Sequence, residues 1–270
     1  MSIPCKICEA PAAECGRQRI LGRHDARYLR CGDCGYVWVE APHWLEEAYS
    51  KAITALDTGI VVRNLWLRDA TCALLGSSFR DVRTVLDHGG GSGLFVRLLR
   101  DRGHDAWWSD AHCENLLARG FEADPEARFD LVTAFELVEH LEEPMAEFER
   151  LHRRAPRLLI STELQPGDPA RLMGWHYLAP EAGQHIGFFT RRSLEVVAER
   201  LGLRLSSNDR NLHVLAPERL SDRWLYLLRK PGWAAKWAWL GSRKSLAHAD
   251  AARQIDSLQA AGAVEITSAK

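Results

Sequence analysis

A glycine-rich turn between two apolar runs is the feature that most constrains this sequence. The stretch VLDHGGGSGLFVRLL spans residues 85–99 and has four glycines in the five positions 89–93. The β-branched and aliphatic residues before the turn predict a strand, and the apolar spacing after it predicts a helix. Glycine allows the positive φ of a tight turn, and its missing Cβ also lets a ligand reach the N–H groups of a helix N-terminus. The turn is therefore either a simple connection or part of a nucleotide-type site.

Two acidic residues favour the nucleotide-type site. Asp87 ends the predicted strand, and glycines follow it at alternate positions: Gly89, Gly91 and Gly93. Asp110 follows the next predicted strand, 19 residues after Gly91. A carboxylate about 20 residues beyond such a turn binds ribose hydroxyls in βαβ nucleotide sites. The alternative, a solvated acid at the end of a strand, remains open at this point.

Four cysteines near the N-terminus form two closely spaced pairs. Five of the seven cysteines lie in the first 34 residues, and the pairs are Cys5 with Cys8 and Cys31 with Cys34. Two such pairs are typical of a tetrahedral zinc site with four thiolates. Because the protein would supply all four ligands, we predict a structural zinc with no open position for substrate. Reduced or redox-active thiols are the alternative.

Changes in residue pattern divide the chain into four parts. Residues 1–40 predict a small zinc ribbon, and 41–80 a helical linker or lid. Residues 81–218 alternate strands with helices, which is typical of a parallel sheet with crossovers. Residues 219–270 form a basic, tryptophan-rich tail that is predicted to be helical. The fold class is therefore α/β, preceded by a small metal-binding unit.

The third part of the chain predicts a specific order of elements. A helix is expected over residues 192–201, followed by a hairpin formed by LRLSS and LHVLA. The expected strands before it are Val82–Leu86, Ala106–Ser109, Gly120–Glu122, Leu131–Phe135 and Leu158–Thr162.

At this point residues 84–216 resemble the class I S-adenosylmethionine-dependent methyltransferases. The resemblance rests on the glycine turn, on Asp110 and on the block FDLVTAFELVEHLEEP at 129–144. It implies a Rossmann-like fold, with a mostly parallel seven-stranded sheet whose last strand is antiparallel. It also implies that Phe135 and Glu136 border the methionine end of S-adenosylmethionine. In this resemblance the residue that contacts adenine is in doubt, with Asp124 as a candidate.

The resemblance extends to the expected substrate class. The stretch RCGDCGYVWVEAP is similar to the zinc ribbon of bacterial methyltransferases that act on sugars and small metabolites. We therefore expect methyl transfer to a hydroxyl of a sugar, a glycan or another small metabolite. Methylation of a carbon in a sugar or keto-type metabolite, a cofactor-binding protein without catalysis, and a nicotinamide dehydrogenase are the alternatives.

A hydroxyl acceptor requires a general base, and histidine titrates in the right range. Ligands of open α/β sheets gather at the carboxyl ends of the strands, which makes His185 the first candidate base and His140 the second. His176 could line an acceptor pocket with its aromatic neighbours Trp175 and Tyr177. For each histidine, a role in packing or in anchoring a loop is the structural alternative.

Charge distribution bears on partners and location. The formal net charge of -1 argues against nucleic acid as a partner, and no Asn-Pro-Pro-Tyr or Asp-Pro-Pro-Tyr motif occurs. Residues 219–244 carry seven Lys and Arg against the single acid Asp222, with five interleaved Trp and Tyr residues. Packing onto the chain's own domain is the main expectation for this segment, and contact with a membrane surface or polymer is the alternative. The N-terminus shows no apolar targeting segment, so we predict a cytoplasmic protein.

Overall fold

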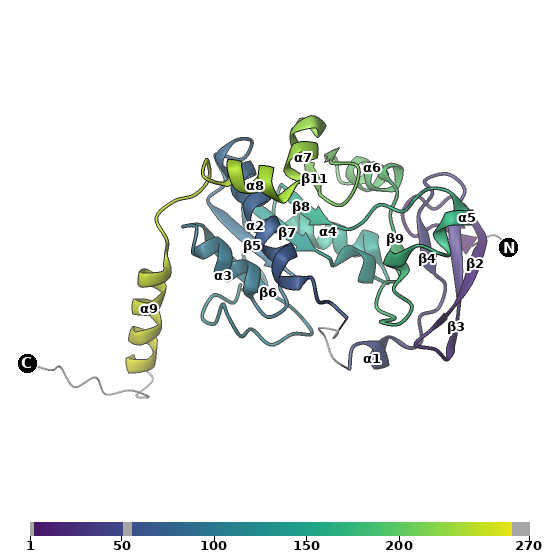
Figure 1. Ribbon diagram of the computed structural model, residues 1–270, viewed down its shortest axis with the longest axis horizontal. Helices are drawn as coiled ribbons and strands as arrows, with labels where there is room; N and C mark the ends of the chain where they lie inside the picture. Colours follow the sequence, from purple (N-terminus) through teal and green to yellow (C-terminus); the bar gives the residue numbers. More distant parts are fainter. Residues whose placement is uncertain (1–2, 51–55, 261–270) are drawn as a thin grey trace, which may run out of the picture.

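The computed structural model describes residues 3–50 and 56–260 (Figure 1). An antiparallel five-stranded sheet lies at the N-terminal end of the molecule, with the strand order β1-β2-β3-β4-β9. Its strands are β1 (Ile3–Pro4), β2 (Pro11–Ile20), β3 (His24–Cys31), β4 (Val37–Val39) and β9 (Gly187–Phe188).

A second sheet of six strands forms the centre of the molecule, in the order β10-β11-β8-β7-β5-β6. Strands β6, β5, β7 and β8 are parallel, whereas β11 is antiparallel to both β8 and β10. The predicted parallel sheet with an antiparallel hairpin at its end is therefore confirmed. The strands are β5 (Thr84–His88), β6 (Asp105–Ser109), β7 (Leu131–Phe135), β8 (Leu158–Ser161), β10 (Arg204–Ser207) and β11 (His213–Ala216).

The prediction of seven strands is wrong, because the described residues form only six in this sheet. The segment expected as a strand at 120–122 makes a single parallel bridge, between Trp108 and Glu122. Residues 110–121, between β6 and this bridge, contain no helix. A parallel crossover usually contains a helix; this connection contains none, and only a single bridge forms beside β6.

Side chains alternate between the two faces of the central sheet, and each face is covered by helices. Leu86, Val132 and Leu158 pack toward α4 (Pro144–Arg154) and α6 (Arg191–Arg200). Their chain neighbours Val85, Leu131 and Leu159 pack on the opposite face. This is the two-residue period of a strand that is buried on both sides. The helices on that second face are α2 (Ile60–Gly76), α3 (Leu94–Arg100), α7 (Asp222–Leu228) and α8 (Pro231–Ala238).

The N-terminal sheet is joined to the rest of the chain through β9. Val37 pairs with Phe188, and Trp38 pairs with Gly187. Tyr36 and Trp38 belong to the same buried cluster as Val132 and the inner face of α4. The segment expected as a zinc ribbon therefore shares a core with the central sheet, although residues 1–2 of it lie outside the described residues.

The predicted linker and tail are both largely helical where the structure describes them. Linker residues 51–55 and tail residues 261–270 lie outside the described residues. None of the helices in residues 3–50 and 56–260 has the length and apolar character that crossing a membrane requires. The remaining helices are α1 (Leu45–Ala48), α5 (Pro169–Leu172), α9 (Ala247–Ala260) and the 3-10 turns η1 (Val138–His140) and η2 (His176–Leu178).

Candidate active site and zinc centre

The four predicted zinc ligands meet at one point of the N-terminal sheet. The sulfur atoms of Cys5, Cys8, Cys31 and Cys34 all lie within 4.8 Å of one another. The Cys8 and Cys31 sulfurs are 3.3 Å apart, and those of Cys5 and Cys34 are 3.6 Å apart. A tetrahedral zinc with bonds of about 2.3 Å separates its sulfur ligands by about 3.8 Å.

Backbone geometry around these sulfurs also fits a metal. The Ile7 N–H donates to Cys5 Sγ at 3.3 Å, and the N–H groups of Asp33 and Cys34 donate to Cys31 Sγ at 3.3 and 3.4 Å. Such N–H donors stabilise negative charge on sulfur, the state in which a thiol binds metal. The cluster could therefore hold one zinc ion with four thiolates. Cys15 lies in a different hydrophobic cluster, against the Tyr28 carbonyl.

The glycine turn connects β5 to α3 and opens onto a cavity of about 490 Å³. Gly91 has φ +54°, and a Cβ placed there would meet no atom within 4 Å. Gly93 has φ +83°, and a Cβ there would lie 2.6 Å from Asn115 Oδ1. The two glycines therefore serve different ends: Gly91 leaves room at the cavity, and Gly93 allows the turn to pack against the chain.

Asp110 is held against the glycine turn. Its Oδ2 accepts from the Gly91 N–H at 2.8 Å, and its Oδ1 accepts from the N–H groups of His112 and Cys113 at 2.7 and 2.8 Å. Three backbone donors therefore fix the carboxylate at the cavity wall, which it lines together with Gly91. This is the placement that the spacing between the turn and Asp110 predicts for a ribose-binding acid.

Asp87 lies at the base of the same cavity. Its side chain is buried and accepts a hydrogen bond from the Thr133 hydroxyl at 2.8 Å. Burial raises the pKa of Asp87 to about 7, and the nearby charge of Asp110 adds to this. A positively charged ligand would favour the ionised carboxylate, so the site is suited to a cation.

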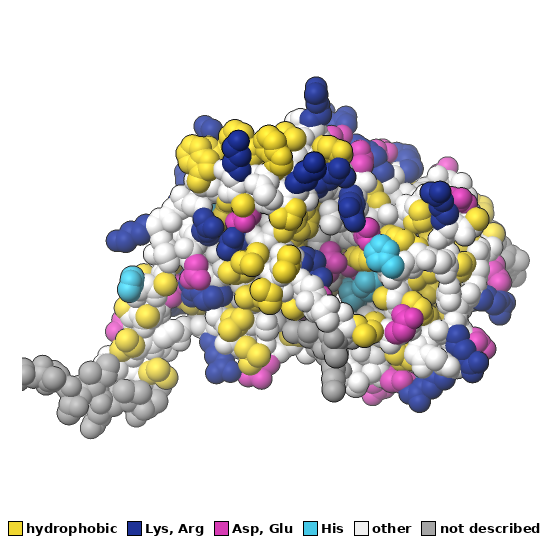
Figure 2. Space-filling view, viewed as in Figure 1, with side chains coloured by type: hydrophobic (Ala, Val, Ile, Leu, Met, Phe, Trp, Pro, Cys, Tyr) yellow, Lys and Arg dark blue, Asp and Glu magenta, His cyan; other side chains and the backbone are white. Residues whose placement is uncertain are grey.

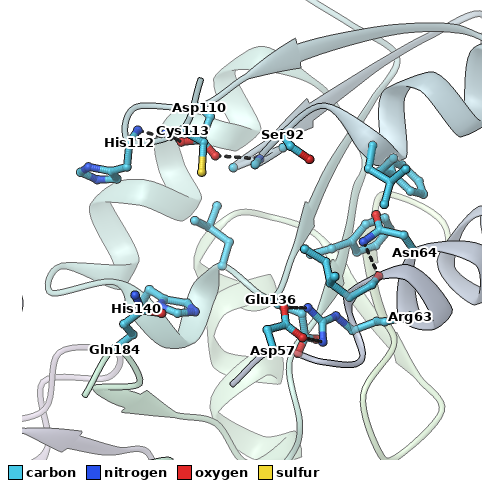
Figure 3. Close-up of a pocket in the computed structure, with 18 of the residues that line it drawn as sticks. Asp57, Arg63, Asn64, Ser92, Asp110, His112, Cys113, Glu136, His140 and Gln184 are labelled. Carbon is cyan, nitrogen blue, oxygen red and sulfur yellow. Dashed lines mark hydrogen bonds and ion pairs between the residues drawn. The ribbon is translucent and has the colours of Figure 1, made fainter. Parts of the chain in front are cut away.

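The cavity has two chemically different sides (Figure 3). Asp110 and Ser92 lie on one side, next to the glycine turn. His140, Gln184 and the ion pair of Arg63 with Asp57 lie on the other. The first side is contributed by the ends of β5 and β6, and the second by α2 and the segments after β7 and η2. We expect the cofactor on the first side and the acceptor on the second.

Two glutamates and a tyrosine form a buried network at the floor of the second side. The Tyr177 hydroxyl donates to Glu139 Oε1 at 2.5 Å and lies 3.4 Å from Glu136 Oε2. The Ser161 hydroxyl donates to Glu136 Oε1 at 2.6 Å. Burial, with the negative charge of Glu136 adding to it, raises the pKa of Glu139 to about 8. Glu136 also has a φ of +49°, an unusual value for a residue with a side chain, which marks the end of β7 as a constrained position.

His185 has the hydrogen bonding of an available base. Its Nδ1 lies 2.6 Å from the backbone carbonyl of Tyr177. A carbonyl can only accept, so Nδ1 carries the proton and Nε2 keeps its lone pair. In the described part of the chain, Nε2 has no hydrogen-bond partner. Burial lowers the pKa of His185, which keeps the imidazole neutral at pH 7.

The other two candidate histidines are placed differently. Nδ1 of His140 lies 2.8 Å from the Tyr49 hydroxyl, and its ring also bonds the Gln184 backbone. Burial lowers the pKa of His140 well below its usual value. His176 is 74 % exposed at the cavity rim, where its Nε2 lies 3.0 Å from Glu163. His140 is therefore tied in place by its neighbours, and His176 is a solvated rim residue.

The structure brings most of the predicted site residues together. Asp87, Gly89, Gly91, Asp110, Phe135 and Glu136 and all three candidate histidines line the cavity. Gly93 does not line it and acts in packing instead. Asp124 also lies outside it, because it is exposed in the loop after β6 and caps the Glu126 N–H. Trp175 is not part of the lining either, since it packs against Phe188 in the core of the N-terminal sheet.

Sequence reasoning missed the residues that the linker contributes to the cavity. Tyr49, Asp57, Arg63 and Asn64 all line it. Arg63 and Asp57 form a bidentate pair at 2.9 and 2.6 Å. The available signal was the presence of Arg63 and Asn64 directly after the apolar residues 60–62 at the start of this helix. Helical periodicity alone does not show which end of a helix meets a distant site.

Comparison with known families agrees with this geometry. The profile that describes a methyltransferase domain matches residues 63–208, more than half of the chain. The chain belongs to the methyltransferase-domain family. The predicted class I methyltransferase family is thereby confirmed, and Asp87, Asp110 and the glycine turn all lie inside the matched range. No match was found among curated protein sequences.

Solved structures similar to this methyltransferase domain are distant in sequence. TnmH is 19% identical with a TM-score of 0.46, and the match covers 65% of this chain and 61% of that one. An O-methyltransferase family protein from Burkholderia thailandensis is 16% identical with a TM-score of 0.44, over 56% and 57% of the two chains. Human N-acetylserotonin methyltransferase is 15% identical with a TM-score of 0.43, over 64% and 65%. The matches therefore span about three fifths of the length of these proteins.

Proposed function

We propose that this methyltransferase moves a methyl group from S-adenosylmethionine to a hydroxyl of a small metabolite such as a sugar, with His185 as general base. The observation that carries the proposal is the hydrogen bond from His185 Nδ1 to the Tyr177 carbonyl at 2.6 Å. It leaves the basic nitrogen of His185 in the same cavity as the glycine turn.

The cofactor side of the cavity fits S-adenosylmethionine in shape and charge. The cavity volume of about 490 Å³ is in the range of small-molecule sites, roughly 300–1,000 Å³. The open space at Gly91 allows a ligand to approach the backbone, and Asp110 offers a carboxylate for the ribose hydroxyls. Asp87 and Glu136 supply negative charge near a ligand that carries positive charge on its sulfur and its amino group.

Two tasks remain for the protein's own residues, alignment of the acceptor and removal of its proton. S-adenosylmethionine supplies a methyl group that its positively charged sulfur already activates. As the acceptor oxygen bonds to the methyl carbon, the carbon–sulfur bond breaks and its electron pair stays on sulfur. His185 Nε2 takes the hydroxyl proton, and the Tyr177 carbonyl stabilises the imidazolium through Nδ1. General base catalysis of this kind contributes about 10²–10⁴ in rate.

Hydroxylated acceptors suit the polar groups on the second side of the cavity. Tyr49, Asn64 and Gln184 can each offer hydrogen bonds there, and the Arg63–Asp57 pair offers both donors and acceptors. Such groups favour hydroxylated acceptors over apolar ones, because a hydroxyl can use the hydrogen-bonding capacity that they keep beyond their bonds within the chain. Of the aromatic neighbours that the sequence predicted around His176, Tyr177 lines the cavity and Trp175 does not, so the proposal rests on hydrogen bonding.

The proposal is tested with zinc-loaded full-length protein and a labelled methyl donor. A panel of monosaccharides, nucleotide-linked sugars and phenols serves as acceptors, and carbon-13 NMR of the product distinguishes an oxygen-bound from a carbon-bound methyl group. His185→Gln should lower kcat about 100-fold or more while leaving the Kd for S-adenosylmethionine within about twofold. His176→Gln, at the exposed rim, is the matched control and should retain most activity.

Three results would contradict parts of this proposal. Full activity of His185→Gln would place the base elsewhere. A carbon-bound methyl product would favour the alternative of a carbon acceptor. Binding of S-adenosylmethionine without turnover of any acceptor in the panel would favour a cofactor-binding protein without catalysis.

A further inference from the structure

The outer face of α7 and α8 exposes aromatic and aliphatic side chains. Tyr226 is 50 % exposed, Trp233 is 40 % exposed and Trp239, which directly follows α8, is 66 % exposed. Leu227 is exposed beside them. Most surfaces of soluble proteins expose large aromatic residues only singly, so a group of this kind indicates a contact surface.

Core packing does not require these exposed rings. Trp224 and Trp237 of the same helices turn inward and meet edge to face, with ring centroids 5.7 Å apart. The backbone after α8 lies directly against the backbone of α2, because a Cβ on Gly241 would lie 1.9 Å from the Cys72 carbonyl oxygen. The helices are thus already held against α2 by their inner sides, and the outward rings contact neighbouring cations instead of the core, with Arg229 over Tyr226 and Lys236 over Trp233.

Basic residues surround the exposed rings without acidic partners. Residues 223–249 contain six Lys and Arg and no Asp or Glu, a local charge of +6 in a chain whose net charge is -1. The nearest preceding acid, Asp222, is already bonded to Arg191. In the described part of the chain, none of the four cations in the segment that runs from α7 through α8 forms an ion pair. These cations are Arg223, Arg229, Lys230 and Lys236.

The same face continues toward the mouth of the cavity. The Trp66 indole of α2 donates to the Leu228 carbonyl at 2.7 Å, which places the end of α7 beside the middle of α2. From there the first turns of α2 expose Val61, Val62 and Leu65. Leu56 is also exposed, and it lines the cavity. Figure 2 shows hydrophobic and basic side chains over α7 and α8, and further hydrophobic side chains over α2.

We propose that this face docks on an anionic lipid bilayer. Trp and Tyr rings prefer the boundary between headgroups and acyl chains, and clustered Lys and Arg bind anionic headgroups. The apolar start of α2 extends the contact toward the cavity, so docking would bring the cavity mouth near the membrane surface. The absence of any acid between Arg223 and His248 favours an anionic surface over a second copy of this nearly neutral chain.

The test measures binding of the full-length, zinc-loaded protein to sedimented vesicles. Vesicles of phosphatidylcholine mixed with phosphatidylglycerol are compared with vesicles of phosphatidylcholine alone. Several basic residues would contact the anionic headgroups together, so the mixed vesicles should bind at least about tenfold more tightly, and added salt should weaken binding. The measurement needs no methyl transfer, so its outcome is independent of the proposed function.

Variants assign the binding to this face. The double variant Lys230→Glu and Lys236→Glu should lower the affinity for mixed vesicles at least about tenfold. Its matched control, Arg83→Glu with Arg153→Glu, reverses two exposed charges elsewhere and should change the affinity less than about twofold. Trp239→Ala should weaken binding several-fold, whereas Leu258→Ala, an exposed aliphatic residue on α9, should not.

Three outcomes would overturn the proposal. The first is equal binding to both vesicle types, and the second is a loss of binding that is the same in the control variant. The third is a dimer of the free chain that Trp239→Ala dissociates, measured by light scattering, because the face would then be covered by a second copy. Retained far-ultraviolet circular dichroism in each variant shows that the chain remains folded.

Discussion

The Val39 N–H donates to the Ile186 carbonyl at 2.8 Å, and Ile186 directly follows His185. The Ile186 N–H in turn donates to the Glu139 carbonyl at 2.8 Å. The loop that carries the candidate base is therefore fixed between the N-terminal sheet and the segment after β7. The cysteine cluster belongs to the same N-terminal sheet. It is therefore connected to the cavity through the pairing of β4 with β9.

Loss of the predicted zinc should therefore reduce activity as well as stability. In Cys31→Ser the zinc site would lose a ligand, β3 and β4 would loosen, and His185 would lose its support from β9. We expect bound zinc to fall, the melting temperature to drop and kcat to decrease at saturating cofactor. Cys15→Ser is the control, because its thiol lies outside the cluster and should leave zinc content unchanged. Normal activity in metal-free protein would contradict the link.

Replacing Asp110 by Asn should weaken cofactor binding without unfolding the chain. The change removes the charge that the Gly91 N–H and two further N–H groups bind. A hydrogen bond to a charged group is worth about 1.5–3 kcal/mol, so the Kd for S-adenosylmethionine should rise about tenfold or more in calorimetric titration. Asp124→Asn alters an exposed acid outside the cavity and should bind the cofactor normally.

Cofactor affinity should rise with pH through the titration of Asp87. Burial raises the pKa of this carboxyl to about 7, so most of it is protonated at pH 6 and little at pH 8. A cationic ligand favours the ionised form and lowers that pKa, so binding releases a proton. Titration calorimetry at about pH 6.5, in buffers with different ionisation enthalpies, should detect this proton. That pH lies about half a unit below the pKa of Asp87. Asp87→Asn should abolish the difference; an unchanged proton release would assign it to another group.

Two glycine substitutions should separate binding from folding. Gly91→Ala places a methyl group in open space at φ +54°, so it should cost about 1 kcal/mol of stability and weaken S-adenosylmethionine binding. Gly93→Ala adds a close approach of 2.6 Å to Asn115 at φ +83°, so it should cost about 3 kcal/mol or more. Urea unfolding and calorimetric titration measure the two effects. Equal stability of both variants would show that the turn can relax.

The buried ion pair of Arg100 and Asp250 should anchor α9. The two side chains are joined at 2.7 and 2.9 Å, and both are almost fully buried. Removing one partner of a buried pair costs about 3–5 kcal/mol, and Asp105 can compensate only part of this for Arg100. Asp250→Ala should therefore lower the free energy of unfolding by about 3 kcal/mol, whereas Asp256→Ala, an exposed acid on the same helix, should not.

The local residue pattern was sufficient to predict the elements that have a clear periodicity and a clear order along the chain. The glycine turn, the strand pattern of residues 131–135 and the paired cysteines predicted the sheet, the cavity-lining acids and the thiol cluster, because each depends on residues close together in the chain. Asp110 was also predictable, since the βαβ unit fixes its distance from Gly91.

Tertiary structure decided what depends on contacts between distant segments. It replaced the expected strand at 120–122 by a single bridge, because the connection after β6 forms no crossover helix. It joined β4 to β9, turned Trp175 into the core, and brought Tyr49 and Arg63 to the cavity. It also distinguished the three histidines, since tautomer and pKa follow from hydrogen bonds and burial that residue spacing does not encode.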